Sequence, residues 1–332
     1  MTKPPKLLDQ VRSRLRLKNY APSTEKTYVY WIVRFIRFHQ MRHPRDMSEI
    51  EVESFLNYLV EREHISPSTQ NQALAALLFL YREVLEQPFT KRMDLIRPKL
   101  CKNLPVVLSV GEVNRVLDQM KGTPRLMIEL MYGSGLRIGE CVGLRVHQLD
   151  LEMGLVHVID GKGRKDRMTI LPKSLKPNLK KHLNQLKFLH QKDLDYGYGR
   201  VPLPYAYHRK NPSASTDFRW QFVFPGNNLI RDEKTGLLGR WSIDRSVVQK
   251  AVKEAVRSAK ITKRVTPHTF RHCFATHLLE AGCDLRMVQN LLGHKNIETT
   301  MIYTHVMDIR KSKIVSPLDY ANSIREDEGF FV

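Results

Sequence analysis

Two imidazoles, a guanidinium and a phenol lie close together in the last third of the chain. These groups belong to His268, Arg271, His294 and Tyr303. The first two are three positions apart, so on a helix they share one face. Cations, proton donors and a phenol together suit the transfer of a phosphoryl group to tyrosine, because the transition state carries negative charge that cations stabilise. The segment therefore predicts Tyr303 as a nucleophile towards phosphorus.

Three short helices joined by tight turns are expected to position these groups. Thr266 is the predicted N-cap of the first helix. Asp284 is placed to cap a second helix over 285–292, and Asn296 to cap a third. Tyr303 is expected two turns inside that third helix.

The composition indicates a polyanionic partner. Of 332 residues, 54 are Lys or Arg and 34 are Asp or Glu, which gives a formal net charge of +20. Such an excess favours a nucleic-acid partner. The four cysteines form no C-x-x-C pair, which is typical of buried thiols in a reducing compartment. With no long apolar run for a signal peptide or a membrane span, a soluble intracellular protein is expected.

Two further cations are expected upstream of this segment. The motif G-L-R-I-G-E places Arg137 at a glycine-broken helix junction. Residues 155–159 and 168–171 read as two strands of a β-hairpin. Its tip, D-G-K-G-R-K-D-R, carries Lys162 and the competing Lys165.

Cutting a DNA phosphodiester without metal needs a nucleophile, cations and an acid. Arg137 and Arg271 can clamp the two nonbridging oxygens with a fork that lysine lacks. Lys162 can protonate the leaving 5′ oxygen. His268 and His294 can hydrogen-bond the phosphoryl oxygens or handle the tyrosine proton. No metal or nucleotide cofactor is needed in this chemistry, because the phosphotyrosine stores the bond energy.

A zinc site is the alternative for the histidines. His268 and His272 are four residues apart, and His277 follows. Arg271 lies inside this group, no carboxylate is interleaved, and His277 is off the shared face. The spacing therefore disfavours zinc.

The N-terminal part reads as a small helical domain. Its predicted helices cover 6–17, 23–40, 48–60 and 66–86. Residues 90–105 are basic and bracketed by prolines, as in a linker. The expected organisation is a DNA-binding domain over 1–90, a linker over 91–105 and a catalytic domain over 106–332. The candidates for phosphate contacts are Lys26, Lys91, Arg92, Arg97 and Lys99.

Five motifs resemble those of the tyrosine site-specific recombinases. They are G-L-R-I-G-E (135–140), G-K-G (161–163), H-T-F-R-H (268–272), L-L-G-H (291–294) and Y-T-H (303–305). The resemblance implies a mainly α fold with a small antiparallel β-hairpin, in a two-domain C-shaped DNA clamp. It implies a 3′-phosphotyrosine at Tyr303 and a supporting role for Glu140. A tetramer on two DNA sites, joined by the tail beyond Met307, is also implied.

The segment 193–219 has no helical or strand periodicity. Its part G-Y-G-R-V-P-L-P-Y-A (197–206), together with the following W-Q-F-V-F-P (220–225), resembles the insertion of integron integrases. That subfamily binds folded single-stranded hairpin sites of gene cassettes through flipped-out bases, which stack on aromatic rings. Trp220 and Trp241 are the candidate platforms, with His157 behind them. Three alternatives remain: a dimer-resolution or phage-type recombinase acting on duplex sites only, a type IB topoisomerase, and a DNA-binding protein without catalysis.

Overall fold

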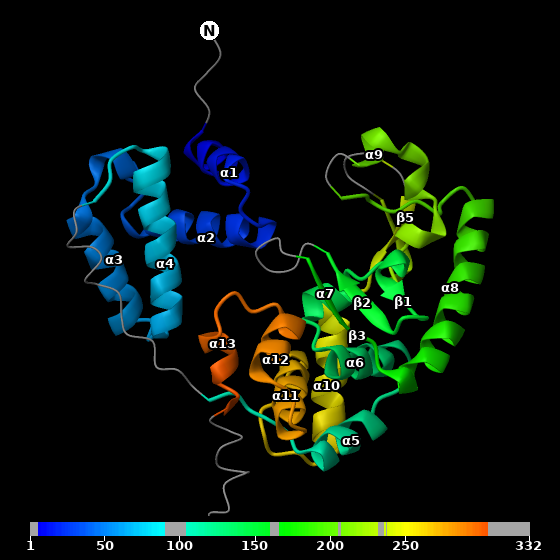
Figure 1. Ribbon diagram of the computed structural model, residues 1–332. Helices are drawn as coiled ribbons and strands as arrows, with labels where there is room; N and C mark the ends of the chain where they lie inside the picture. Colours follow the sequence, from blue (N-terminus) through cyan, green and yellow to red (C-terminus); the bar gives the residue numbers. More distant parts are fainter. Residues whose placement is uncertain are drawn as a thin grey trace, which may run out of the picture. The chain divides into compact units, whose positions relative to one another are not determined.

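A computed structural model places most of the chain (Figure 1). It describes residues 6–89, 104–159, 166–204, 207–231, 236 and 238–304. The chain divides into two compact units, Met1–Asn103 and Leu104–Val332. Each unit has its own hydrophobic core.

The first unit is helical throughout its described part, 6–89. Its helices are α1 (Leu7–Leu17), α2 (Pro22–Phe38), α3 (Glu49–Glu61) and α4 (Pro67–Phe79), and the π-helical turn η2 (Leu80–Val84) continues α4. The four predicted helices are thus confirmed. Trp31 and Phe35 of α2 are buried with Phe55 of α3 in one core. Helix α3 begins with a capping box, in which the Ser48 N–H donates to the Glu51 carboxylate over 2.6 Å.

The second unit surrounds its core with further helices. They are α5 (Val110–Asp118), α6 (Gly122–Ser134), α7 (Ile138–Val142), α8 (Lys176–Asp195), α9 (Tyr207–Lys210), α10 (Arg245–Ser258), α11 (Pro267–Glu280), α12 (Leu285–Leu292) and α13 (Glu298–Met301). Helices α6 and α11 pack against each other. The bounds predicted for α12 are confirmed. None of the helices in the described part of the chain has the length and apolar character needed to span a membrane.

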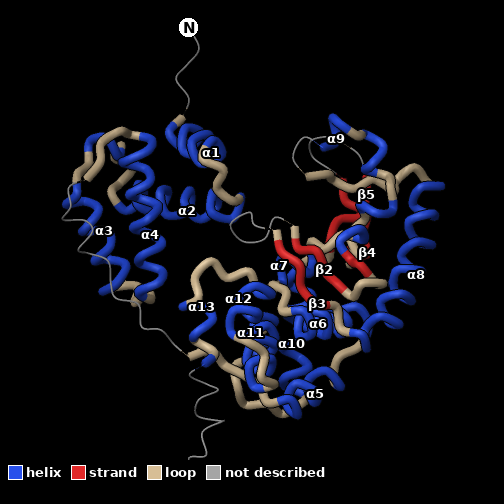
Figure 2. Tube along the Cα trace, in the orientation of Figure 1, coloured by secondary structure: helices blue, strands red, loops and turns tan. Residues whose placement is uncertain are grey.

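Two small antiparallel sheets lie in this unit, drawn red in Figure 2. The first has strands β1 (Leu149–Asp150), β2 (Leu155–Val158) and β3 (Arg167–Ile170), and the second has β4 (Pro225–Arg231) and β5 (Leu238–Ser242). The predicted hairpin is confirmed, with Val158 opposite Arg167 at the end nearest its tip. A mainly α fold with small antiparallel sheets is therefore confirmed.

Two local predictions from the sequence, a strand over 220–225 and a helix capped by Ser242, are wrong. The segment 220–225 is not a strand: Phe218–Trp220 form a 3-10 turn and β4 begins only at Pro225. The apolar residues between them are buried, and Phe222 forms an isolated antiparallel bridge with Arg145, in which the Val223 N–H donates to the Leu144 carbonyl over 2.8 Å. Helix α10 is capped by Asp244, whose carboxylate accepts from the Ser246 N–H over 2.8 Å.

Candidate active site

Arg271 is the most buried charge of the site, with 1% of its surface exposed. Its helix, α11, begins after Thr266, as predicted; the Thr266 N–H donates to the Thr269 hydroxyl over 3.0 Å. Arg271 Nη1 donates to the Gly135 carbonyl over 2.5 Å, and Nη2 to the Leu292 carbonyl over 2.7 Å. Two other segments of backbone therefore fix this guanidinium.

Gly135 makes the turn that delivers Arg137. Its φ is 64°, in the left-handed region, and a Cβ there would lie 2.5 Å from the Phe274 ring. Glycine alone meets both conditions without strain. Arg137 then becomes the N-cap of α7, and its N–H donates to the Glu140 carboxylate over 2.8 Å. The predicted junction at Arg137 is confirmed.

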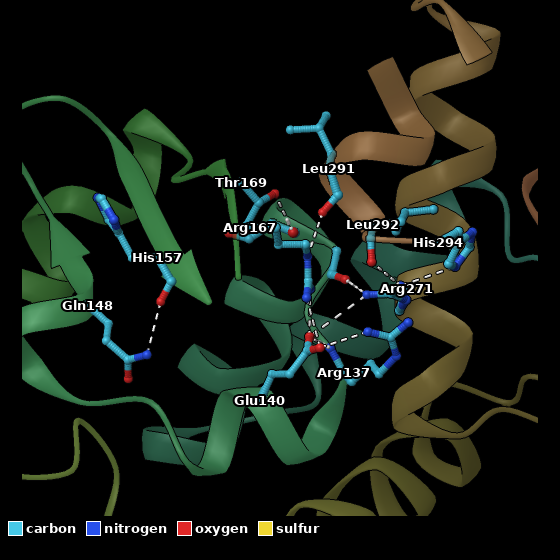
Figure 3. A network of polar contacts seen from close by, with 12 residues as sticks. Arg137, Glu140, Gln148, His157, Arg167, Thr169, Arg271, Leu291, Leu292 and His294 are labelled. Atoms are coloured by element: carbon cyan, nitrogen blue, oxygen red, sulfur yellow. Dashed lines mark hydrogen bonds and ion pairs between the residues drawn. The ribbon is translucent and has the colours of Figure 1, made fainter. Parts of the chain in front are cut away.

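One carboxylate, that of Glu140, joins three arginines (Figure 3). It accepts from Arg137 Nη1 over 2.7 Å and from Arg167 at both oxygens, over 2.9 and 2.7 Å. Arg271 Nη1 lies 3.9 Å from the same carboxylate. Three cations around one anion leave an excess of positive charge, which suits a phosphodiester.

The arginines also set the protonation state of Glu140. Burial alone would raise the pKa of this carboxyl, but the hydrogen bonds from Arg167 and Arg137 outweigh it and lower the pKa to about 2. Burial, followed by the charge of Arg137, lowers the pKa of Arg271 to about 9. At neutral pH the carboxylate is thus ionised and the guanidinium is protonated.

Arg167 is the main residue that the sequence reasoning missed. It opens β3, its side chain is 8% exposed, and its Nε donates to the Leu291 carbonyl over 2.9 Å. It ties the β2–β3 hairpin to both Glu140 and the end of α12. The available signal is strand alternation, because Arg167 shares an inward phase with the buried Thr169.

His294 follows the left-handed Gly293, which ends α12. Its Nε2 lies 3.2 Å from Arg271 Nη2, and its Nδ1 lies 2.9 Å from the Thr300 hydroxyl. Burial, followed by the charge of Arg271, lowers the pKa of His294 to about 3. The imidazole is therefore neutral at neutral pH. Because arginine can only donate, Nε2 is the acceptor and Nδ1 carries the proton.

Tyr303 lies beside this cluster, with 2% of its surface exposed. Its hydroxyl is 2.8 Å from Nδ1 of His272, and its ring is stacked with that of His294 at 6.4 Å between centroids. Burial raises the pKa of Tyr303 to about 12, although Arg271 and then Arg137 act in the opposite direction. The phenol therefore keeps its proton at neutral pH.

The helix before Tyr303 is shorter than predicted. Helix α13 starts after Ile297, with no side-chain cap, and ends at Met301. The N–H of Tyr303 donates to the Thr300 carbonyl, three residues back, over 3.1 Å. Tyr303 therefore lies in a turn that follows α13 and not in the second turn of a helix. The predicted cap at Asn296 is wrong.

Two of the three histidines of α11 contact each other, and the third has other partners. The rings of His268 and His272 meet edge to face with centroids 4.5 Å apart. His277 instead contacts the Tyr132 hydroxyl over 2.8 Å and the Leu108 carbonyl over 2.9 Å. Across the described ranges, no group of three or more His, Cys, Asp or Glu residues is arranged to hold a metal ion.

Several predicted residues lie outside the described residues. They are Lys162 and Lys165 at the hairpin tip, and Lys91, Arg92, Arg97 and Lys99. The base of the hairpin is placed, because Arg167 is bound to Glu140. In the first unit, Lys26 is exposed on α2. It lines a shallow groove together with Arg12, Tyr30, Arg34 and Arg37.

The predicted aromatic platforms lie in different settings. The Trp220 ring is 4.5 Å from that of His147 and 4.8 Å from that of Tyr207 between centroids, and the Arg145 guanidinium is 5.7 Å from it. This group joins the 193–219 segment to the rest of the unit. Trp241 is half-buried on β5.

His157 has its place in β2, where it pairs with Met168. Its carbonyl accepts from Gln148 Nε2 over 3.1 Å. Its imidazole points away from the arginine cluster (Figure 3). The side chain therefore takes no part in that cluster.

Comparison with known proteins gives the class of this fold and site. Residues 107–310 match the phage integrase family, and residues 7–91 match the N-terminal SAM-like domain of phage integrases. The chain belongs to the phage integrase family, the tyrosine recombinases, which cleave and rejoin DNA.

Individual relatives are similar along most of their length. An "Integrase/recombinase" of Escherichia coli is 45% identical over 314 residues, covering 95% of this chain and 93% of its own. Tyrosine recombinase XerC of Halalkalibacterium halodurans is 33% identical over 304 residues, covering 87% and 88%. The solved structure of XerH site-specific recombinase bound to difH has the same fold: the TM-score is 0.60 at 20% identity, covering 95% of this chain and 86% of that one.

Proposed function

We propose that this recombinase cuts DNA with Tyr303 and integrates and excises integron gene cassettes, using folded single-stranded hairpin sites. The observation that supports the catalytic part is the cluster of three arginines around Glu140. The charges of two of them, Arg271 and Arg137, also act on the Tyr303 phenol and favour its ionised form. A cationic, largely preassembled site stabilises charge on phosphorus without reorganising during the reaction.

Each catalytic residue has a role in this proposal. Arg137 and Arg271 bind the two nonbridging oxygens of the scissile phosphate, and Lys162 protonates the leaving 5′ oxygen. His268 and His294 complete the shell around the phosphoryl oxygens. The product of the first step is a 3′-phosphotyrosine, which the 5′ hydroxyl of a second strand attacks in the rejoining step.

The nucleophile is tested with a nicked recombination site, which traps the covalent adduct. We expect Tyr303→Phe to form no adduct while binding DNA normally, because only the phenolic oxygen is removed. Tyr132→Phe is the matched control, since it removes the phenolic oxygen of a different, half-buried tyrosine of the same unit. A covalent adduct formed by Tyr303→Phe on a gel would show that the nucleophile is another residue.

The hairpin-site part of the proposal is supported by the 193–219 segment. Tyr207 of this segment lies with Trp220, which directly follows the segment, and with His147 and Arg145 in a group of rings and a guanidinium. Such groups stack on unpaired bases at roughly 1–3 kcal/mol per base. Trp220, assisted by Trp241, is the proposed platform for a flipped-out base.

Band-shift titration of a folded cassette strand against its duplex tests this part. The wild-type protein should bind the hairpin more tightly, and Trp220→Ala should lose about tenfold or more of hairpin affinity with duplex affinity unchanged. Phe188→Ala, which removes an exposed ring from α8, is the control. Equal affinity of the wild type for hairpin and duplex would overturn the proposal.

A second candidate function is resolution of DNA dimers at duplex sites. The 33% identity to tyrosine recombinase XerC favours it. In that case the band-shift experiment gives duplex binding at least as tight as hairpin binding, and Trp220→Ala changes neither.

The same proposal covers the assembly and its setting. The first unit, with Lys26 and three arginines in its groove, and a linker over 91–105 bind DNA phosphates. Four protomers act on two sites, in the bacterial cytoplasm on the nucleoid.

A further inference from the structure

His272 contacts the proposed nucleophile directly. Its Nδ1 lies 2.8 Å from the Tyr303 hydroxyl, and the two ring planes are tilted by 51°. We propose that His272 is a catalytic residue that takes the Tyr303 proton as the phenolic oxygen attacks phosphorus. This inference rests on the proposed function, in which Tyr303 is the nucleophile.

The neighbouring imidazoles are less suited to this task. His294 lies face to face with the phenol, and its two nitrogens are engaged by Arg271 and by the Thr300 hydroxyl. His268 lies edge to face against the His272 ring, one helical turn away on α11. His272 instead has a ring nitrogen within hydrogen-bond distance of the Tyr303 oxygen.

Protonation states before DNA binds agree with this role. Burial, followed by the charges of His268 and Arg271, lowers the pKa of His272 to about 4, so the imidazole is neutral and able to accept. The tautomer with its proton on Nε2 leaves Nδ1 as the acceptor from the phenol. A phosphodiester held by Arg271 offsets one of the charges that disfavour the imidazolium. Substrate binding therefore makes His272 a stronger base.

The step balances in both directions. The bond from Tyr303 Oη to phosphorus forms, the bond from phosphorus to the 5′ oxygen breaks, and the Oη proton moves to His272 Nδ1. The leaving 5′ oxygen takes its proton from Lys162. In the rejoining step a 5′ hydroxyl gives its proton back to Lys162 and attacks phosphorus. The bond from phosphorus to Tyr303 Oη breaks, and the His272 imidazolium returns its proton to the departing phenolate.

The alternative role for this contact is that of a lock, which holds the Tyr303 phenol in an inactive position until DNA binds. Only 2% of the Tyr303 surface is exposed, so the site has to open before a phosphate reaches the hydroxyl. The two roles differ in sign: removing a lock speeds formation of the covalent adduct, whereas removing the base slows it.

The first experiment measures single-turnover adduct formation by His272→Gln on a nicked site. Glutamine keeps a hydrogen-bonding partner for the phenol but cannot take its proton. We expect the rate to fall about 100-fold or more, with DNA affinity unchanged. Adduct formation at or above the wild-type rate would overturn the inference.

A second measurement separates proton transfer from a structural defect. Tyr303 is replaced by 3,5-difluorotyrosine, whose phenol is more acidic and needs less help to lose its proton. The His272→Gln defect should then shrink at least tenfold. A defect of the same size with both phenols would show a structural role and overturn the inference.

A third substrate distinguishes the base from the acid. A 5′-bridging phosphorothiolate has a sulfur leaving group that needs no proton, so it should rescue Lys162→Ala but not His272→Gln. Equal rescue of both variants would contradict a role for His272 on the nucleophile side. No adduct from the wild type, or an adduct from Tyr303→Phe, would instead remove the proposed function itself.

Discussion

Gly135 has three structural roles. It turns the chain in a left-handed conformation, lies against the Phe274 ring and accepts a hydrogen bond from Arg271. The position of Arg137, two residues later, depends on the same turn. A side chain at position 135 would therefore disturb both arginines of the proposed phosphate site.

Gly135→Ala should destabilise the second unit by about 2–4 kcal/mol, since left-handed strain adds to overpacking against Phe274. Gly122→Ala is a matched control, because Gly122 has a φ of 60° and a Cβ added there would meet no atom within 4 Å. We expect about 1–2 kcal/mol for that control. Chemical unfolding curves of the two variants measure the difference, and equal losses would rule out the steric part.

At the scale of elements, Arg167 is the link between the hairpin and the helices. It joins β3 to Glu140 of α7 and to the last turn of α12. Gly293, at the end of α12, packs so closely that a Cβ there would lie 2.7 Å from Arg167 Cδ. The hairpin that carries Lys162 is thus fixed at its base.

Arg167→Met should lower the rate of adduct formation by roughly tenfold to a hundredfold, because small displacements of catalytic groups have effects of that size. DNA affinity should stay within about twofold, since the side chain is buried. Arg125→Met is the control, because Arg125 pairs with Glu129 in a more exposed i, i+4 pair of little energetic weight. Similar rates for both variants would refute the positioning role.

Local sequence signals predicted the elements better than the contacts between them. Asp284 caps α12 as expected, because such signals act within a few residues, and Gly293 ends the helix in a left-handed conformation. The ion pair of Arg167 with Glu140 spans 27 residues, and the contact of His272 with Tyr303 spans 31. Such contacts depend on tertiary packing, so they cannot be predicted from the residue pattern of a single helix.

At the scale of the whole molecule, the site is a region of buried charge in a strongly basic protein. The formal net charge of the chain is +20. Within the described part of the site, neutral imidazoles lie next to arginines, as His294 does next to Arg271. Protonating those imidazoles would add charge where burial and cations oppose it. The stability of the second unit should therefore depend on pH.

Two histidines and one carboxyl decide in which direction the stability of the second unit changes with pH. The folded-state pKa values of His272 and His294 are lowered to about 4 and about 3, so below pH 6.5 the unfolded chain binds protons that the folded chain does not. Their stabilisation is complete above that pH and is lost as the pH falls towards 3. Glu140, with its pKa lowered to about 2, adds a further loss below about pH 4.5.

Between pH 7 and pH 5 we expect a loss of roughly 1–2 kcal/mol, discounted for the partial exposure of both imidazoles. For a unit of this size that corresponds to a fall in Tm of about 3–6 °C. The double variant His272→Gln, His294→Gln lacks both titrating groups, so its Tm should fall less over the same interval. Thermal unfolding at several pH values measures how Tm changes with pH in the wild type and in the double variant. The same change in both would show that other groups cause the acid sensitivity.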